Sequence, residues 1–177
     1  HMTHPVVGDL ERMQEAGARI CVCPTTELDL GDGFLPNAYR DGVSLCVGSD
    51  SQTTIDMMAE SRALELHGRG VAGRRNVLAP VGEPHGLAER LLRTAIQGGQ
   101  IALGRQGSGI EVGQEADLTA VRLDSPTALG MPPLEALVFS SRPEWVSEVW
   151  VRGQRVVHRG VHPDRAQIMK DAAVWMS

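Results

Sequence analysis

The 177-residue sequence has no long hydrophobic run, no block of basic residues and only three cysteines. No apolar run approaches the ~20 residues that a membrane-spanning helix needs, and no signal peptide is visible. The net charge is −5 and lysine and arginine do not cluster, which argues against a nucleic-acid or anionic-membrane partner. We therefore expect a globular domain that has neither partner and is long enough to bury a core.

The cysteines favour a reducing compartment. An odd number of thiols inside apolar stretches does not suit a disulfide framework, so a cytoplasmic protein is expected. Cys21 and Cys23 have the C-x-C spacing of some metal sites, but they alternate with Ile20 and Val22, and no second Cys/His pair has matching spacing. We interpret these two thiols and Cys46 as core residues.

Hydrophobic patterning predicts an α/β arrangement in the first part of the chain. The two short apolar runs RICVCP and VSLCVG lack polar alternation, which is typical of parallel strands buried on both faces by helices. Helices are expected before, between and after these strands, as in a β/α barrel or an open α/β sheet. The expected helices cover residues 7–17, 36–41, 54–68 and 86–104, with a turn-rich loop over 25–36 and a break at Gly98-Gly99.

The pattern changes near residue 106, where a small β module is expected. Residues 107–126 suggest two short strands around a Gly-Gln turn, and residues 132–141 suggest a helix that begins with proline. Alternating valines around Arg152-Gly153-Gln154 predict a hairpin over 146–162, followed by an amphipathic terminal helix.

Polar residues directly follow each of the two buried strands. Thr25, Thr26 and Glu27 follow the first, and Ser49-Asp50-Ser51 follows the second. Functional residues of parallel α/β folds lie at these carboxyl ends. Asp50 could therefore be catalytic, or it could cap the following helix, and the residues alone leave both interpretations open.

Four stretches together resemble the metal-dependent amidohydrolase superfamily, and within it the formimidoylglutamate deiminases of histidine degradation. These stretches are CPTTELDLGDGFLP, GVSLCVGSDS, ESRALELHGR and GSGIEVGQEADLTAV, and the likeness is collinear over nearly the whole chain. The resemblance implies an α/β fold: the C-terminal part of a (β/α)8 TIM barrel over 1–105 and part of a small β-sandwich subdomain over 106–165. Residues 166–177 form the C-terminal helix.

The resemblance also implies roles for residues near the start of the chain and after the second strand. Asp50 corresponds to the aspartate of the eighth barrel strand, which ligates the divalent metal, zinc or another ion, and accepts a proton. His1 begins an H-x-T-H motif that corresponds to the end of the sixth strand, where the first histidine polarises the substrate or the hydrolytic water. His4 corresponds to the second histidine of that motif, and its role is left open. His1-Met2 is also a common vector-derived dipeptide, so whether His1 is native stays open too.

Other polar residues are expected to line the pocket of a small-molecule substrate. Thr25, Thr26 and Glu27 correspond to the end of the seventh strand and would face the substrate. Ser51, with Ser49, would orient the Asp50 carboxylate or cap the next helix. The implied reaction is hydrolysis of a non-peptide C–N bond, deiminating N-formimino-L-glutamate with release of ammonia.

Most of the family's metal ligands are missing from this sequence. The H-x-H motif of the first barrel strand has no counterpart, and His67, His85, His158 and His162 are assigned surface or structural roles. A catalytic zinc usually needs three protein ligands, and only Asp50 and, less surely, His1 are available as ligands in this sequence. Zinc is therefore assigned to a full-length parent, and this chain alone is expected to be inactive and to hold metal weakly or not at all.

Two further functions and an oligomeric state follow from the same observations. A related aminohydrolase acting on a purine, pyrimidine or triazine ring would share the GSDS motif. A truncated, non-catalytic interaction domain is the alternative from another class. Because a few barrel strands would expose sheet edges, a homo-oligomer is expected.

Overall fold

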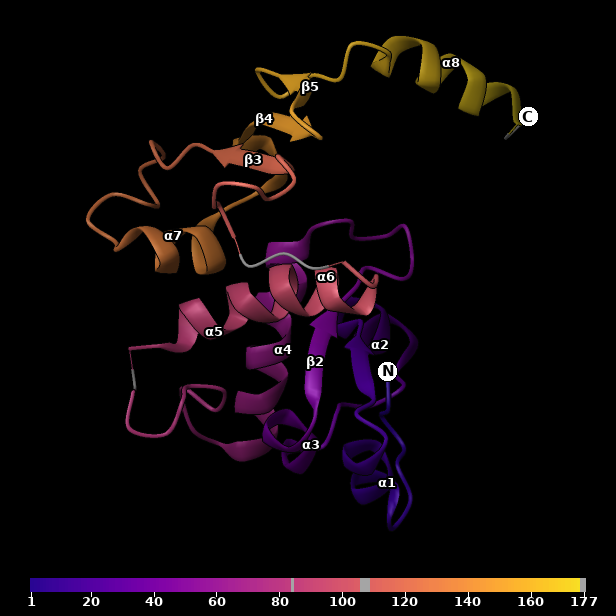
Figure 1. Cartoon of the computed structure of the whole chain (residues 1–177), viewed down its shortest axis with the longest axis vertical. Coiled ribbons are helices and arrows are strands. Elements are labelled where there is room, and N and C mark those ends of the chain that lie inside the picture. Colours follow the sequence, from indigo (N-terminus) through magenta and orange to yellow (C-terminus); the bar gives the residue numbers. More distant parts are fainter. Residues whose placement is uncertain (84, 106–108, 176–177) are drawn as a thin grey trace.

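The computed structural model describes residues 1–83, 85–105 and 109–175. Helices surround a pair of strands at one end of the molecule, and a small sheet and the last helix form the other end (Figure 1). The elements of the first part are α1 (Asp9–Glu15), β1 (Arg19–Val22), α2 (Pro24–Leu30), α3 (Asn37–Gly42), β2 (Ser44–Val47), α4 (Met57–Ala72), α5 (Leu87–Arg93), the π-helical turn η1 (Thr94–Gly98) and α6 (Gly99–Ala102). Those of the second are β3 (Leu118–Val121), α7 (Pro133–Ser140), the 3-10 turn η2 (Pro143–Trp145), β4 (Val146–Val151), β5 (Gln154–His158) and α8 (Arg165–Trp175).

The two apolar runs form the predicted parallel pair. Strand β1 pairs with β2 so that Ile20 lies opposite Leu45 and Cys21 opposite Cys46. Ile20 and Val22 point into the main apolar core, where side chains from α4, α5 and α7 meet them. The α/β class and the helices around this sheet are confirmed, with ends shifted by a few residues from those expected.

The first half of the turn-rich segment after β1 is a helix, and residues 31–36 are the expected loop. Pro24 occupies the first turn of α2, where its fixed φ favours a helix and its missing N–H costs nothing. Gly31 ends the helix in the left-handed conformation, with φ of 72°. The loop prediction is therefore wrong for residues 25–30 only, because proline and glycine stand at the two positions where they start and stop a helix. Consequently the residues after β1 are fixed on a rigid element.

Gly98 and Gly99 do not divide the helical segment over residues 87–102. Both have helical dihedrals, with φ of −57° and −64°, and α5 continues through the π-helical turn into α6. A Cβ added at Gly98 would lie 2.3 Å from the carbonyl oxygen of Leu45. The glycine is therefore needed where the helix touches strand β2, and not as a helix breaker.

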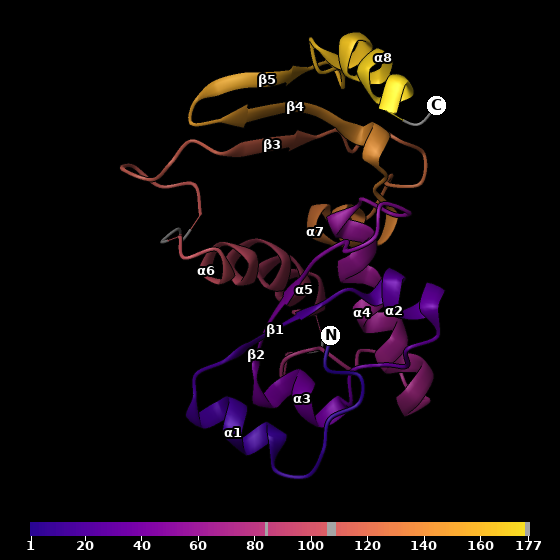
Figure 2. The ribbon, with the colours of Figure 1, turned by 90° about the vertical axis from the view of Figure 1, so that its right-hand side faces the viewer.

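The second part of the chain is an antiparallel sheet in the order β3-β4-β5. Figure 2 shows its strands side by side, with α8 beyond them. The predicted hairpin is confirmed, and Arg152 and Gly153 both have positive φ, which suits a tight two-residue turn. Of the two strands expected over 107–126, only β3 is found in the part that the structure describes, and residues 106–108 lie outside it.

Helix α7 connects the two parts of the molecule. It packs against α4 and α5 (Figures 1 and 2), and its Val138 is fully buried in the main core. The predicted terminal helix is also present as α8, and none of its described residues is buried. Within the described residues, no helix is both long and apolar enough to cross a membrane. The boundaries at residues 105 and 165 remain predictions.

Substitution of Gly98 by alanine tests the close approach of the helix to the sheet. The added methyl group would collide with the backbone of Leu45 and Cys46, so the free energy of unfolding should fall by about 3 kcal/mol. Gly99 is the matched control, because a Cβ there meets nothing within 4 Å and Gly99→Ala should gain about 0.5–1 kcal/mol. Urea denaturation of both variants checks this, and equal stabilities would contradict the packing described.

Candidate active site

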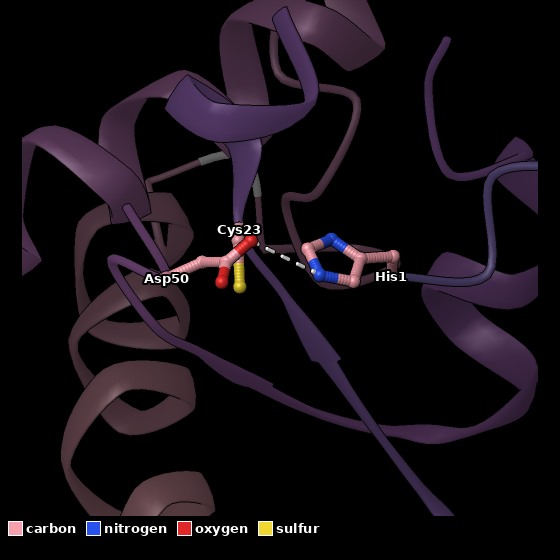
Figure 3. A group of neighbouring side chains, drawn as sticks. All are labelled: His1, Cys23 and Asp50. Carbon is pink, nitrogen blue, oxygen red and sulfur yellow. Dashed lines mark ion pairs between the residues drawn. The ribbon is translucent and has the colours of Figure 1, made fainter. Parts of the chain in front are cut away.

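The site lies where β1 and β2 end. Cys23 directly follows β1, Asp50 lies in the loop after β2, and the first residues of the chain bring His1 beside them (Figure 3). The His1 backbone nitrogen donates a hydrogen bond of 2.8 Å to the Cys21 carbonyl, which ties this segment to β1. His1 Nε2 lies 3.4 Å from Asp50 Oδ2. One potential ligand atom from each of His1, Cys23 and Asp50 lies within 4.8 Å of the others.

The buried carboxylate of Glu27 contacts two of these three residues, His1 and Cys23. Glu27 Oε1 accepts a hydrogen bond from the Cys23 backbone N–H at 3.0 Å and lies 3.1 Å from His1 Nδ1. Burial raises the pKa of Glu27, and the hydrogen bond from Cys23 opposes that shift. Its second oxygen, Oε2, is buried and has no hydrogen-bond partner among the described residues. Glu27 thus orients His1 and Cys23 together.

The site opens into a cavity of about 420 Å³. His1, Cys21, Cys23 and Asp50 line it. Thr25, Thr26, Glu27 and Ser51 were expected to bind substrate, and among the described residues they are not part of this lining. Their contact with substrate remains a prediction, and the hydrogen bonds described below show what they do in this structure.

Asp50 does not cap the helix that follows it. The N-cap of α4 is Asp56, whose carboxylate accepts from the backbone N–H groups of Met58 and Ala59. Asp50 has a positive φ of 55°, and its side chain is 47% exposed, so the carboxylate can meet a ligand from solvent. The capping interpretation is therefore wrong, and the position at the strand end agrees with the functional one.

Thr26 fixes the loop that carries Asp50. The buried hydroxyl of Thr26 donates to the Ser49 carbonyl at 2.9 Å and accepts from the Ser51 backbone N–H at 3.2 Å. It also lies 3.1 Å from the Ser51 hydroxyl, which contacts Thr53 in turn. These bonds flank Asp50 on both sides and hold its backbone in the left-handed conformation.

Thr25 points away from the cavity, toward α4. Its backbone N–H donates to Glu60 Oε2 at 3.0 Å, and its hydroxyl donates to Glu60 Oε1. Glu60 is fully buried, and burial raises its pKa against the opposing hydrogen bonds from Thr25. This pair joins α2 to α4 and so sets the position of the first turn of α2.

The prediction of three core thiols holds for two of the cysteines. Cys23 and Cys46 are buried, whereas Cys21 is exposed toward the cavity, and all three are free. Burial, reinforced by the neighbouring Cys21 thiol, raises the pKa of Cys23 to about 12. Sequence reasoning missed Cys23 as a site residue although its place at the strand end, beside Pro24, was a usable signal.

The remaining histidines lie outside the site. His4 is exposed near Gly33. His67 is buried in α4 against Phe34, with ring centroids 4.4 Å apart, and burial lowers its pKa to about 4. His158 pairs with Glu148 on the hairpin at 2.9 Å.

The donor types of the site suit a borderline-soft divalent ion. Imidazole nitrogen, thiol sulfur and carboxylate oxygen are the three ligand classes that zinc accepts in proteins. The residues present therefore fit a zinc-like metal.

Comparisons with known proteins point to one family. The model of the amidohydrolase family matches residues 1–156. The chain is 32% identical to the formimidoylglutamate deiminase of Pseudomonas aeruginosa over 167 residues, which cover 92% of this chain and 37% of that protein. It is 29% identical to a 5-methylthioadenosine/S-adenosylhomocysteine deaminase of Teredinibacter turnerae, covering 99% of this chain and 40% of that protein.

A solved structure agrees with these relatives. An adenosine deaminase from Xanthomonas campestris with bound zinc superimposes with a TM-score of 0.87 at 28% identity, covering 99% of this chain and 40% of that one. The chain thus spans about two fifths of the length of the proteins that it matches.

Replacing Thr26 by valine tests the clamp on the Asp50 loop. Thr26→Val removes the hydroxyl at nearly constant shape and leaves the Ser51 N–H without its acceptor, so the free energy of unfolding should fall by about 1–3 kcal/mol. Hydrogen exchange at the Ser51 amide should become faster.

The control is Thr26→Ser, which loses a methyl group worth about 1 kcal/mol but keeps the hydroxyl. It should keep the Ser51 amide protected. Equal exchange rates in the two variants would show that the hydroxyl does not hold the loop.

Proposed function

This chain belongs to the amidohydrolase family, and on that premise we propose that it is the C-terminal portion of a metal-dependent hydrolase acting on a non-peptide C–N bond. The preferred substrate is N-formimino-L-glutamate, with ammonia as a product. The observation that carries the proposal is the Asp50–His1 pair at the strand ends, in a chain 32% identical to a formimidoylglutamate deiminase over 92% of its length.

Asp50, His1 and Cys23 are the residues of this chain that could hold or face the metal. When bound, a divalent metal supplies Lewis acidity that activates the hydrolytic water. Asp50 is exposed enough to accept the proton of that water and to pass it to the departing ammonia. His1 is held by Glu27 at Nδ1, and its Nε2 lies beside Asp50 at the cavity. When Nε2 carries a proton, it can donate a hydrogen bond to the formimino group and so polarise it.

A ring aminohydrolase is the second candidate. It is favoured by the 29% identity to a 5-methylthioadenosine/S-adenosylhomocysteine deaminase and by the TM-score of 0.87 to a zinc-containing adenosine deaminase. The two substrate classes require the same proton transfer through Asp50 and the same polarisation by His1, so the geometry of this pair supports both. The linear substrate is preferred because the TTE-x-x-LGDG stretch resembles the deiminase branch.

Several accompanying proposals concern the protein's surroundings. A small-molecule substrate agrees with the cavity beside Asp50. A homo-oligomer is proposed because β1 and β2 form a two-stranded sheet whose outer edges could pair with other strands. A cytoplasmic location is proposed because the three cysteines are free. The alternative is a non-catalytic domain, in which this portion of the protein serves only in assembly or interaction with other proteins.

The test is ammonia release by the full-length protein carrying this portion, with formimino-amino acids and adenine nucleosides as substrates. N-formimino-L-glutamate should be turned over with the highest kcat/KM. Asp50→Asn should lower kcat by about a thousandfold, the range of positioned general acid–base groups. Asp56→Asn, which keeps a capping side chain, is the control and should retain activity.

Two results would overturn this assignment. A higher kcat/KM on adenine nucleosides would favour the ring aminohydrolase. Full activity in Asp50→Asn would remove the proposed catalytic carboxylate.

A further inference from the structure

We propose that this chain by itself binds one thiophilic divalent cation through His1 Nε2, the Cys23 thiolate and an Asp50 carboxylate oxygen. The inference rests on the proposed function for the presence of a cation beside Asp50. The sulfur ligand is new, and it raises the donor set of this chain from two residues to three. It therefore changes the expectation, drawn from the sequence, that the chain alone holds metal weakly or not at all.

The three donors converge from segments far apart in the sequence. Cys23 follows β1 and is 5% exposed, Asp50 follows β2, and His1 lies on a segment tied to the Cys21 carbonyl (Figure 3). Their nearest ligand atoms lie within 4.8 Å of one another. Two of them follow the paired strands β1 and β2, so the three donors border one small space.

The Glu27 carboxylate determines which nitrogen of His1 is available. An ionised Glu27 carboxylate can only accept, so the contact of 3.1 Å between its Oε1 and His1 Nδ1 places the proton on Nδ1. A neutral His1 then presents the lone pair of Nε2 to Asp50 Oδ2 at 3.4 Å. Two acceptors facing each other at this distance repel unless a cation, either a proton or a metal, lies between them.

The surroundings of Cys23 leave room for a metal ion and favour a metal ion over a proton as the cation between His1 and Asp50. Gly48 lines the cavity, and a Cβ there would lie 3.1 Å from Cys21 Sγ and 3.5 Å from Cys23 Sγ, so the glycine keeps space open beside both sulfurs. Histidine ligands of metals commonly donate their other ring N–H to a carboxylate, which orients the imidazole. Glu27 accepts from His1 in this way. A proton would satisfy His1 and Asp50 but would not engage the Cys23 sulfur, whereas a metal ion would engage all three.

Binding is balanced by loss of one proton. The Cys23 S–H proton passes to solvent, the sulfur lone pair bonds to the cation, and no oxidant or reductant is involved. A set of nitrogen, sulfur and oxygen donors selects Zn²⁺, Co²⁺ or Cd²⁺ over Mg²⁺, which prefers oxygen ligands alone.

The experiment is a titration of the metal-free 177-residue chain with Co²⁺, followed by absorption spectroscopy. The thiolate-to-cobalt charge-transfer band in the near ultraviolet should appear and saturate at one ion per chain, and Zn²⁺ but not Mg²⁺ should remove it by competition. Cys23→Ser should lose the band. Cys21→Ser, which changes the exposed neighbouring thiol, is the matched control and should keep it.

Asp50→Asn separates this inference from the proposed function. It should weaken Co²⁺ binding at least tenfold while the residual complex keeps the charge-transfer band. If Cys23→Ser binds Co²⁺ as wild type does while Asp50→Asn does not, the sulfur ligand is wrong and the proposed role of Asp50 stands. If Asp50→Asn binds as wild type does, both the three-donor site and the proposed metal ligand are wrong.

A measurement on the unaltered chain covers the case in which Cys23→Ser fails to fold by circular dichroism. Alkylation of each cysteine by a maleimide is followed by peptide mass spectrometry, with and without Zn²⁺. Zn²⁺ should slow the alkylation of Cys23 at least tenfold and leave Cys21 within about twofold. Absence of the charge-transfer band in wild type, loss of the band in Cys21→Ser, or equal alkylation of Cys23 with and without Zn²⁺ would overturn the proposal.

Discussion

The site depends on one buried carboxylate. Glu27 lies in the first turn of α2 with its side chain inaccessible to solvent, and one of its oxygens meets both His1 and the backbone of Cys23. Hydrogen bonds to charged groups contribute about 1.5–3 kcal/mol each, and here they offset part of the cost of burying the carboxylate. His1 and Cys23 are both residues of the candidate site. The buried Glu27 carboxylate therefore orients both of them beside Asp50.

The rest of the fold positions that carboxylate and its neighbours. Thr25 anchors α2 to Glu60 of α4, and Thr26 holds the loop of Asp50, so the first turn of α2 reaches both α4 and the end of β2. The helix at Gly98 packs directly on β2. The strand ends, and therefore Cys23 and Asp50, are fixed by packing on one side and by side-chain hydrogen bonds on the other. A preorganised site of this kind is what proton transfer and ion binding require.

Much of this architecture could be predicted from local pattern, and the contacts inside the site could not. Apolar runs without alternation indicated the parallel strands, and Arg152-Gly153 indicated the hairpin. Gly98 was predicted to break the helix, because the contact that requires a glycine there is with strand β2, far away in the sequence. Glu27 was expected to face the substrate, and that stays a prediction, whereas its contact with His1, 26 positions away, could not be read from local pattern. The resemblance to amidohydrolases identified Asp50 and His1, whereas Cys23 was set aside because alternation alone assigned it to the core.

The most direct test of this account is the protonation state of the His1 imidazole in the metal-free chain, measured by long-range proton–nitrogen NMR correlation. The account predicts that Nδ1 carries a proton, because it donates to Glu27, and that Glu27→Gln alters the Nδ1 resonance more than Asp50→Asn does. A neutral His1 with its only proton on Nε2 would contradict it, since Glu27 would then not orient His1 and Nε2 would have no lone pair to offer.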